Sequence, residues 1–177
     1  MSTISKKMCM IGDFGVGKTS LICRFVDRSF SDQYLSTVGV KISRKMLELS
    51  NPNQQDQLNL QVLIWDIEGS TKFKAIAPSY LQGSKGALIV ADVTRPETLS
   101  NLSQHIKLFL SVNPKGYAIV ALNKADLVEP EKLAKLLEIY QFPEQNRVLG
   151  VQATSAKLGD GVDQIFHKLA HSMVQPE

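Results

Sequence analysis

The chain has 177 residues, and its 20 Lys and Arg residues against 17 Asp and Glu residues give a formal net charge of +3. This length suits one domain, 1–177, that buries a sizeable core without disulfides or structural metals. Because the basic residues are scattered rather than clustered, the composition argues against a nucleic-acid-binding protein.

Strand-like and helix-like segments alternate along the chain. We expect strands at 4–12, 39–49, 58–66, 85–93, 115–123 and 147–153, and helices that begin near Lys18, Lys72, Pro96, Pro130 and Gly161. This order predicts an α/β fold, a six-stranded, mostly parallel sheet with five helices on both faces. Ligands should bind outside the C-terminal ends of its strands.

The second and third predicted strands have no helix between them. A polar stretch, SNPNQQDQ at 50–57, separates them and contains an Asn-Pro pair that favours a turn. These two strands should therefore form one antiparallel pair, closed by a rather long loop.

Several features bear on the cellular compartment. Cys9 and Cys23 lack disulfide or metal spacing, so we expect buried free thiols in a reducing compartment. The N-terminal apolar run is too short for a signal peptide, and no stretch is long enough to span a bilayer. No C-terminal cysteine is available for prenylation, and residue 2 is not the glycine needed for myristoylation. We expect a cytoplasmic protein without a lipid anchor.

The first motif is GDFGVGKT at 12–19, which fits the pattern G-x-x-x-x-G-K-[ST] between a predicted strand and a predicted helix. Its glycines let the backbone curl so that successive N–H groups face phosphates at the positive end of the helix. Lys18 should reach the β- and γ-phosphates, and the Thr19 hydroxyl should bind Mg²⁺. The alternative is a glycine-rich turn that merely caps a helix, which the spacing and the Lys-Thr pair disfavour.

A second motif, NKAD at 123–126, ends the fifth predicted strand. The Asp126 carboxylate can accept hydrogen bonds from the ring N–H and the exocyclic amine of guanine. Adenine would instead place an unpaired acceptor opposite this carboxylate. Such a site can reject the wrong base by roughly 10⁴-fold. Alone, this four-residue pattern could arise by chance or supply a helix-capping Asp; its place at a strand end after a phosphate loop favours guanine recognition.

A third motif, TSAK at 154–157, follows the last predicted strand, and the Ala156 N–H could bond the guanine carbonyl. The alternative is a Ser-containing approach to a helix. With YLSTVGV, WDIEG and ADVT between the motifs already described, the chain resembles small GTPases of the Ras superfamily, most similar to the Rab branch. The resemblance covers essentially the whole chain and implies a P-loop NTPase (small G-protein) fold with GTP/GDP and Mg²⁺ as cofactors.

The resemblance also implies specific contacts. It places Mg²⁺ on Thr19, on Thr37 and, through water, on Asp66. It implies that the residues which touch the nucleotide are Phe14, Gly15, Val16, Gly17, Lys18, Thr19, Ser20, Phe30, Tyr34, Thr37, Gly69, Asn123, Lys124, Asp126, Ser155, Ala156 and Lys157.

Four of these positions carry the switching that the resemblance implies. Phe30 should pack against the guanine, and Tyr34 should fold over the phosphates. Thr37 should bind Mg²⁺ only while a γ-phosphate is present, and the Gly69 N–H should contact that phosphate, so its loss would release both loops. Ordinary core packing is the alternative for Phe30 and Tyr34, and a turn or capping role is the alternative for Thr37.

Three residues depart from the family pattern. Ser70 stands where the family has the glutamine that orients the attacking water, Phe14 replaces a small residue, and Glu68 replaces alanine. With Lys18, Thr37, Gly69 and a weak Ser70 as the catalytic candidates, we expect slow GTP hydrolysis. The hypotheses are therefore a GTP/GDP-dependent switch with slow turnover, or a nucleotide-bound adaptor without productive turnover. A kinase or ATPase is a third, which NKAD disfavours.

Partner proteins are also implied by the resemblance. Effectors, exchange factors or activating proteins would bind through residues 30–42 and 65–81 of a monomer. Trp65 and Phe73 match aromatics that Rab-like proteins expose to effectors, although either could be buried. Ile42 stands where those proteins usually carry phenylalanine, which argues against recognition by ordinary Rab effectors.

Overall fold

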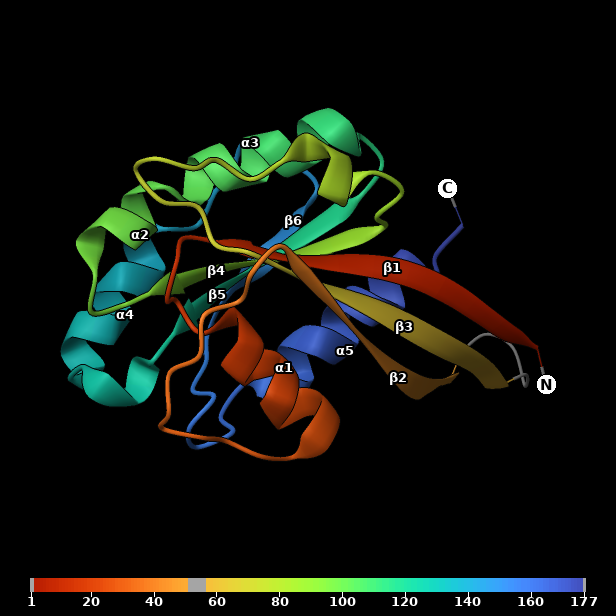
Figure 1. Ribbon diagram of the computed structural model, residues 1–177, viewed down its shortest axis with the longest axis horizontal. Helices are drawn as coiled ribbons and strands as arrows, with labels where there is room; N and C mark the ends of the chain where they lie inside the picture. The colour runs from red at the N-terminus through yellow and green to blue at the C-terminus, as the bar shows by residue number, and fades with distance from the viewer. Residues whose placement is uncertain (1, 51–56, 177) are drawn as a thin grey trace.

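The computed structural model describes residues 2–50 and 57–176 and has an α/β architecture around one six-stranded sheet (Figure 1). The strand order is β2-β3-β1-β4-β5-β6, and every neighbouring pair is parallel except the antiparallel pair β2 and β3. The predicted sheet is therefore confirmed, while most of the loop predicted between β2 and β3 lies outside the described residues. The strands are β1 (Thr3–Gly12), β2 (Val40–Ser50), β3 (Gln57–Ile67), β4 (Gly86–Asp92), β5 (Tyr117–Asn123) and β6 (Val148–Ala153).

Helices cover both faces of this sheet. The α-helices are α1 (Lys18–Asp27), α2 (Pro96–Ser100), α3 (Leu102–Val112), α4 (Pro130–Ile139) and α5 (Val162–Met173), and the 3₁₀ helices are η1 (Pro78–Leu81) and η2 (Ala125–Leu127). Helices α1 and α5 pack on one face, and α3 and α4 pack on the other (Figure 1). The helix predicted from Pro96 is divided, because Asn101 separates α2 from α3.

The central strands supply both halves of the core. In β4, Leu88 and Val90 join the core under α1 and α5, whereas Ile89 and Ala91 join the core under α3. Successive side chains of a strand point to opposite faces, so a strand covered on both faces must be apolar throughout. All seven residues of β4 are buried accordingly, which holds the strand ends that carry the motifs in fixed positions.

The helix predicted to begin near Lys72 is wrong, because residues 71–77 form an irregular segment before η1. The Thr71 hydroxyl accepts hydrogen bonds from the N–H groups of Phe73 (3.2 Å) and Lys74 (3.1 Å), which is a local turn that competes with a helix. The residue before Pro78 is extended, as proline favours in its predecessor. Sequence periodicity alone misses both effects.

Candidate functional site

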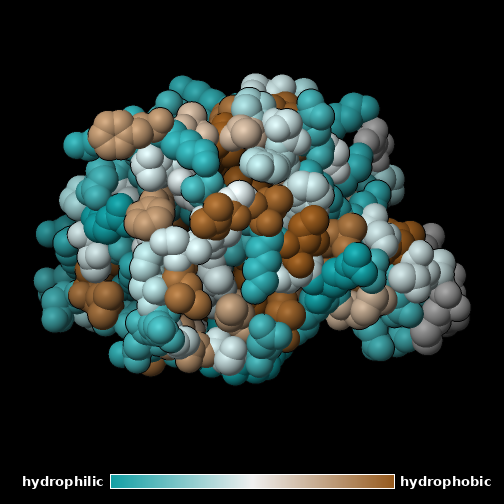
Figure 2. Space-filling view, viewed as in Figure 1, coloured by the Kyte–Doolittle hydropathy of each residue, from teal (hydrophilic) through white to brown (hydrophobic). Residues whose placement is uncertain are grey.

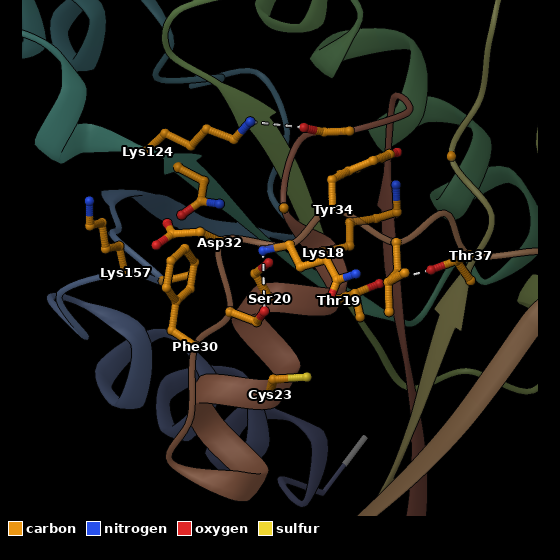
Figure 3. A pocket seen from close by; sticks show the side chains of 18 of the residues that line it. Lys18, Thr19, Ser20, Cys23, Phe30, Asp32, Tyr34, Thr37, Lys124 and Lys157 are labelled. Carbon is orange, nitrogen blue, oxygen red and sulfur yellow. Dashed lines mark hydrogen bonds between the residues drawn. The ribbon is translucent and has the colours of Figure 1, made fainter.

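A cavity of about 460 Å³ opens at the C-terminal edge of the parallel strands (Figure 3). Its walls come from the phosphate loop (residues 12–19), from residues 30–37, and from the loops that follow β5 and β6. This is where a doubly wound sheet places its ligands, since the loops at the strand ends converge there. Cys23 also lines the cavity and is only partly buried, so the expectation of two buried thiols holds for Cys9 but is wrong for Cys23.

Lys18 is the buried cation of this cavity. Its ammonium donates hydrogen bonds to the carbonyl groups of Gly12 and Asp13, each at 3.1 Å. Burial lowers the pKa of Lys18 to about 8, although the nearby carboxylates of Asp66 and Asp13 oppose this shift. An anionic ligand would favour the charged form of Lys18, so this amine is placed to bind phosphate.

Two residues of the NKAD motif form side-chain hydrogen bonds to the phosphate loop. The Asn123 side-chain amide donates to the Val16 carbonyl at 3.0 Å. The Lys124 ammonium donates to the Gly15 carbonyl at 3.0 Å, the upper dashed line in Figure 3, and pairs with the buried Asp92 carboxylate at 2.9 Å. The NKAD motif, which the sequence predicts to bind the base, thus also fixes the conformation of the phosphate loop.

An oxygen cluster lies at the start of α1. The Thr19 hydroxyl donates to Asp66 Oδ2 at 2.6 Å and lies 2.8 Å from the Thr37 hydroxyl, as the dashed line in Figure 3 shows. Asp66 Oδ1 is buried and has no hydrogen-bond partner among residues 2–50 and 57–176, and burial raises the pKa of this carboxyl group. Two hydroxyls and a carboxylate that has one buried, unpaired oxygen suit Mg²⁺, which prefers oxygen ligands and keeps bound waters. These residues therefore fit the predicted magnesium site.

The opposite end of the cavity holds the residues predicted to recognise guanine. The Ser155 hydroxyl donates to Asp126 Oδ1 at 2.8 Å, which fixes this carboxylate while leaving Oδ2 for a ligand. Ala156 and Lys157 line the cavity beside it. Phe30 turns its ring into the cavity in Figure 3, so an apolar surface and an acceptor for two donors share this end.

Ser70 is turned away from the cavity and does not line it. Its hydroxyl donates to Asp13 Oδ1 at 2.9 Å, its N–H donates to the Gly12 carbonyl, and its carbonyl accepts from the Phe14 N–H at 2.9 Å. Gly69 packs so closely that a Cβ there would lie 2.5 Å from the Phe14 Cα. The hydroxyl at the position of the family's glutamine is therefore engaged with the phosphate loop.

The Asp13 carboxylate is the centre of a buried polar cluster. Besides the Ser70 hydroxyl, His105 Nε2 lies 2.7 Å from Asp13 Oδ1, and Asn101 Nδ2 donates to Asp13 Oδ2 at 2.7 Å. Burial raises the pKa of Asp13, but these three hydrogen bonds outweigh burial and leave the pKa below its usual value. The cluster joins the phosphate loop to α3.

Glu68 is not among the described residues that line the cavity, so its carboxylate adds no negative charge to the cavity wall. Its carboxylate pairs with Lys74 at 2.8 Å and accepts the Gly39 N–H at 3.3 Å, and its own N–H donates to the Gly39 carbonyl. Glu68 thereby connects the two segments that the resemblance makes responsive to the nucleotide.

Two aromatic rings border the phosphate end of the cavity. Phe14 and Tyr34 meet edge to face, with ring centroids 5.6 Å apart. Both remain partly exposed, at 40% and 59%. Tyr34 thus contacts the phosphate loop through Phe14, a residue that the family pattern lacks.

Most of the predicted ligand residues converge on one cavity. Val16, Asp66, Ser70 and Ser155 do not line it, although each contacts a residue that does. The predicted residues that line the cavity are Phe14, Gly15, Gly17, Lys18, Thr19, Ser20, Phe30, Tyr34, Thr37, Gly69, Asn123, Lys124, Asp126, Ala156 and Lys157.

The sequence did not reveal three residues that hold the phosphate loop: Arg95, Asn101 and His105. Arg95 Nη1 donates to the Phe14 carbonyl at 2.7 Å, and the other two bind Asp13. Their contacts span more than 80 positions of sequence and belong to no motif, so no local signal marks them.

The family model that matches the chain describes the Ras family and covers residues 7–175. The chain belongs to the Ras family. Human Ras-related protein Rab-22A is 32% identical to it over 165 residues, 93% of this chain and 81% of that protein. Ras-related protein Rab-4 of Dictyostelium discoideum is 31% identical over 169 residues, 95% and 78% of the two chains. GTP-binding protein ypt4 of Schizosaccharomyces pombe is 27% identical over 168 residues, 95% and 71%.

Ras-family membership confirms the predicted small GTPase fold and its likeness to Rab proteins, and it implies guanine-nucleotide binding, typically with Mg²⁺. Within residues 2–50 and 57–176 of this Ras-family protein, no helix has the length and apolar character to cross a membrane. The same residues contain no group of three or more His, Cys, Asp or Glu side chains placed to hold a metal. The oxygen cluster described above is of a different kind, because it combines one carboxylate with two hydroxyls.

Proposed function

We propose that this protein is a Mg²⁺-dependent GTP/GDP switch whose unaided GTP hydrolysis is slow. The observation that carries the proposal is the contact between the Thr37 and Thr19 hydroxyls at 2.8 Å. It connects an exposed segment to the residue that ends the phosphate loop, beside the unpaired oxygen of Asp66. A Mg²⁺ bound there with the nucleotide would hold Thr37, and a change at the γ-phosphate would alter the order of its segment.

Guanine selectivity rests on Asp126, whose Oδ1 is fixed by Ser155. Titration with fluorescent nucleotides should show far tighter binding of GDP and GTP than of ATP, and binding should weaken when Mg²⁺ is chelated. Asp126→Ala should remove the preference for guanine. Asp160→Ala changes an exposed Asp in the neighbouring loop and serves as the matched control. Comparable affinities of the wild-type protein for ATP and GTP would refute the proposal.

Slow hydrolysis rests on the two departures at Ser70 and Phe14. Phosphoryl transfer depends almost entirely on positioning and charge stabilisation, and a small GTPase that has its glutamine manages only about 3–5 × 10⁻⁴ s⁻¹ unaided. The Ser70 side chain is shorter than that of glutamine, and its hydroxyl is hydrogen-bonded to Asp13. The Phe14 ring would in addition obstruct an arginine supplied by an activating protein.

Single-turnover phosphate release tests this point. Ser70→Gln should restore little hydrolysis alone, because the longer side chain must leave the Asp13 cluster and avoid the Phe14 ring. Ser70→Gln combined with Phe14→Gly should restore more than the sum of the single changes, since the glutamine can reach the phosphate only when the Phe14 ring is removed. A wild-type rate at or above the unaided rate quoted above, unchanged by both substitutions, would show that the chain positions water in another way.

A nucleotide-bound adaptor is the second candidate, and one observation favours it. Ser70 and Phe14 pair through a backbone hydrogen bond, and Ser70 also bonds Gly12 and Asp13, so the start of the segment after β3 is fixed without any γ-phosphate. In an adaptor the nucleotide would stabilise the fold but would not change it. The nucleotide that the purified protein carries, and hydrogen exchange in its GDP and GTP forms, separate the two candidates.

Partner recognition is assigned to residues 30–42 and 65–81, within a single GTPase domain. Leu35, Val38 and Phe73 are 73%, 83% and 96% exposed. Figure 2 shows hydrophobic side chains gathered near the middle of the face over which residues 30–40 and β2 run. Effectors or regulators that read the nucleotide state would dock on these apolar residues.

A further inference from the structure

Five consecutive carbonyl groups of the phosphate loop, from Gly12 to Val16, each accept a hydrogen bond from a side chain. Three of the donor residues belong to the motifs of the sequence, and one, Arg95, belongs to none. The donors are Lys18 to Gly12 and Asp13, Arg95 to Phe14, Lys124 to Gly15, and Asn123 to Val16.

Arg95 is held in place by its own backbone. It follows β4, and its N–H donates to the Asp92 carbonyl at 3.0 Å. Its carbonyl accepts the N–H (3.0 Å) and the hydroxyl (2.8 Å) of the buried Thr98. The guanidinium is oriented further by Glu97, which lies 3.1 Å from Nε. The donor to the phosphate loop is therefore positioned before any ligand binds.

The bond from Arg95 fixes the direction of a neighbouring N–H group. The Phe14 carbonyl and the Gly15 N–H belong to one planar peptide unit and point in opposite directions. Because Arg95 Nη1 holds that carbonyl at 2.7 Å, the Gly15 N–H is held facing the other way. Gly15 lines the cavity, so Arg95 keeps a donor of the anion-binding loop oriented for use.

The guanidinium also brings positive charge close to the loop. A Cβ built on Gly15 would lie 3.3 Å from Arg95 Nη1. The pKa of Lys18 is lowered mainly by burial, and the charge of Arg95 adds to that effect. The field of Arg95 therefore reaches the amine that is placed to bind phosphate.

We propose that Arg95 is a positioning residue for the β- and γ-phosphates of a bound guanine nucleotide, and that it slows nucleotide release. It does so through the Phe14–Gly15 peptide and through its charge, and the inference rests on the guanine-nucleotide binding proposed above. On this proposal the second phosphate of a nucleoside diphosphate reaches the Gly15 N–H, whereas a nucleoside monophosphate stops short of it.

The experiment measures the release of fluorescently labelled GDP and the competing affinities of GDP and GMP for the full chain. Arg95→Gln should speed GDP release and weaken GDP binding on the order of tenfold, the effect of losing a hydrogen bond from a charged group. GMP affinity should stay unchanged. Arg95→Lys keeps the charge but not the planar fork, so it should fall between Arg95→Gln and the wild type.

Two further variants complete the test. Arg44→Gln removes the same charge from an exposed position in β2 that does not line the cavity, and it should change neither affinity. Glu97→Gln removes only the charge of the carboxylate that pairs with Arg95 Nε at a partly exposed position, and it should speed GDP release about twofold. This variant keeps the test valid if Arg95→Gln fails to fold.

The outcomes are distinct. An equal loss of GDP and GMP affinity in Arg95→Gln would assign Arg95 a general structural role and overturn the inference. Unchanged GDP release in Arg95→Gln, or in Arg95→Lys and Glu97→Gln together, would also overturn it. Failure of the wild-type protein to bind GDP at all would refute the proposed function itself, and the inference would fall with it.

Discussion

The phosphate loop and the segment at 30–39 line the same cavity but are held in opposite ways. Each loop carbonyl from Gly12 to Val16 is bonded to a side chain. The segment at 30–39 is held by hydrogen bonds of the Thr37 hydroxyl and the Gly39 backbone, by the Tyr34 ring against Phe14 and by Phe30 against the core. Its Val38 side chain is 83% exposed. One wall of the cavity is preformed, and the other depends on a few scattered contacts.

This difference indicates which wall can report the state of a ligand. A loop that is bonded along its whole length has little freedom to lose, so it suits tight binding of phosphate in any state. A segment with few buried apolar contacts opens at low cost, and its order can follow the ligand. The proposed switch therefore needs both walls, one rigid and one responsive.

Matched glycine substitutions should give the largest difference between the two walls. Gly17 and Gly39 both have positive φ, at 101° and 68°. A Cβ on Gly17 would overlap the Asn123 amide, whereas a Cβ on Gly39 would have the Tyr80 hydroxyl as its nearest neighbour at 4.0 Å. Gly17→Ala should lower the free energy of unfolding by about 3 kcal/mol, from backbone strain and a disturbed buried hydrogen bond.

Gly39→Ala should cost about 1 kcal/mol, from backbone strain alone. Urea denaturation of the ligand-free protein measures both losses. Equal losses at the two positions would show that the phosphate loop is no more tightly constrained than the segment at 30–39.

Thr37→Val should loosen only the responsive wall. The substitution keeps the shape of the side chain but removes the hydroxyl that meets Thr19. We expect a loss of about 1 kcal/mol or less in the free energy of unfolding. Hydrogen exchange should become faster at 31–39 and stay the same at 12–19. Faster exchange in both segments would mean that the phosphate loop depends on Thr37 for its order.

Low pH should weaken the rigid wall through Asp13, with the smallest effect of the three. The folded pKa of Asp13 lies below its value of about 3.9 in the unfolded chain. Its ionised form therefore stabilises the fold fully above that value, and this contribution disappears as the pH falls through the folded pKa. The stability difference between wild type and Asp13→Asn should be constant near neutrality and close below about pH 4.

His105 and Ser70 each bond the same oxygen of the Asp13 carboxylate. Variants of these two residues are therefore matched tests of that cluster. Denaturation curves of Asp13→Asn and the wild type at several pH values provide the measurement. A difference that persists unchanged at low pH would show that the charge of Asp13 contributes nothing.

The sequence predicted the parts of this molecule that local patterns encode. The alternating segments gave the sheet, and the spacing within the phosphate loop and NKAD gave the two ends of the cavity. It failed where another interaction overrode a local pattern, as at Lys72, where the Thr71 hydroxyl forms a turn.

It also failed where contacts join distant parts of the chain. Ser70 meets Asp13 across 57 positions, and Arg95 meets Phe14 across 81. A one-dimensional pattern does not state which way these side chains turn. The resemblance placed Ser70 near the attacking water, but the parallel pairing of Ser70 with the phosphate loop turns its hydroxyl to Asp13 instead.

Hydrogen exchange of the Mg²⁺ complexes with GDP and with a nonhydrolysable GTP analogue tests most directly whether one wall is rigid and the other responsive. We predict slower exchange with the GTP analogue at 31–39 and at 71–77, because Mg²⁺ would hold Thr37 and the contact of the Gly69 N–H with the γ-phosphate would order the residues that follow. We predict no difference at 12–19, where side-chain hydrogen bonds already hold the chain. Identical exchange at 31–39 in the two complexes would contradict the proposed switch and support a fixed, nucleotide-bound adaptor.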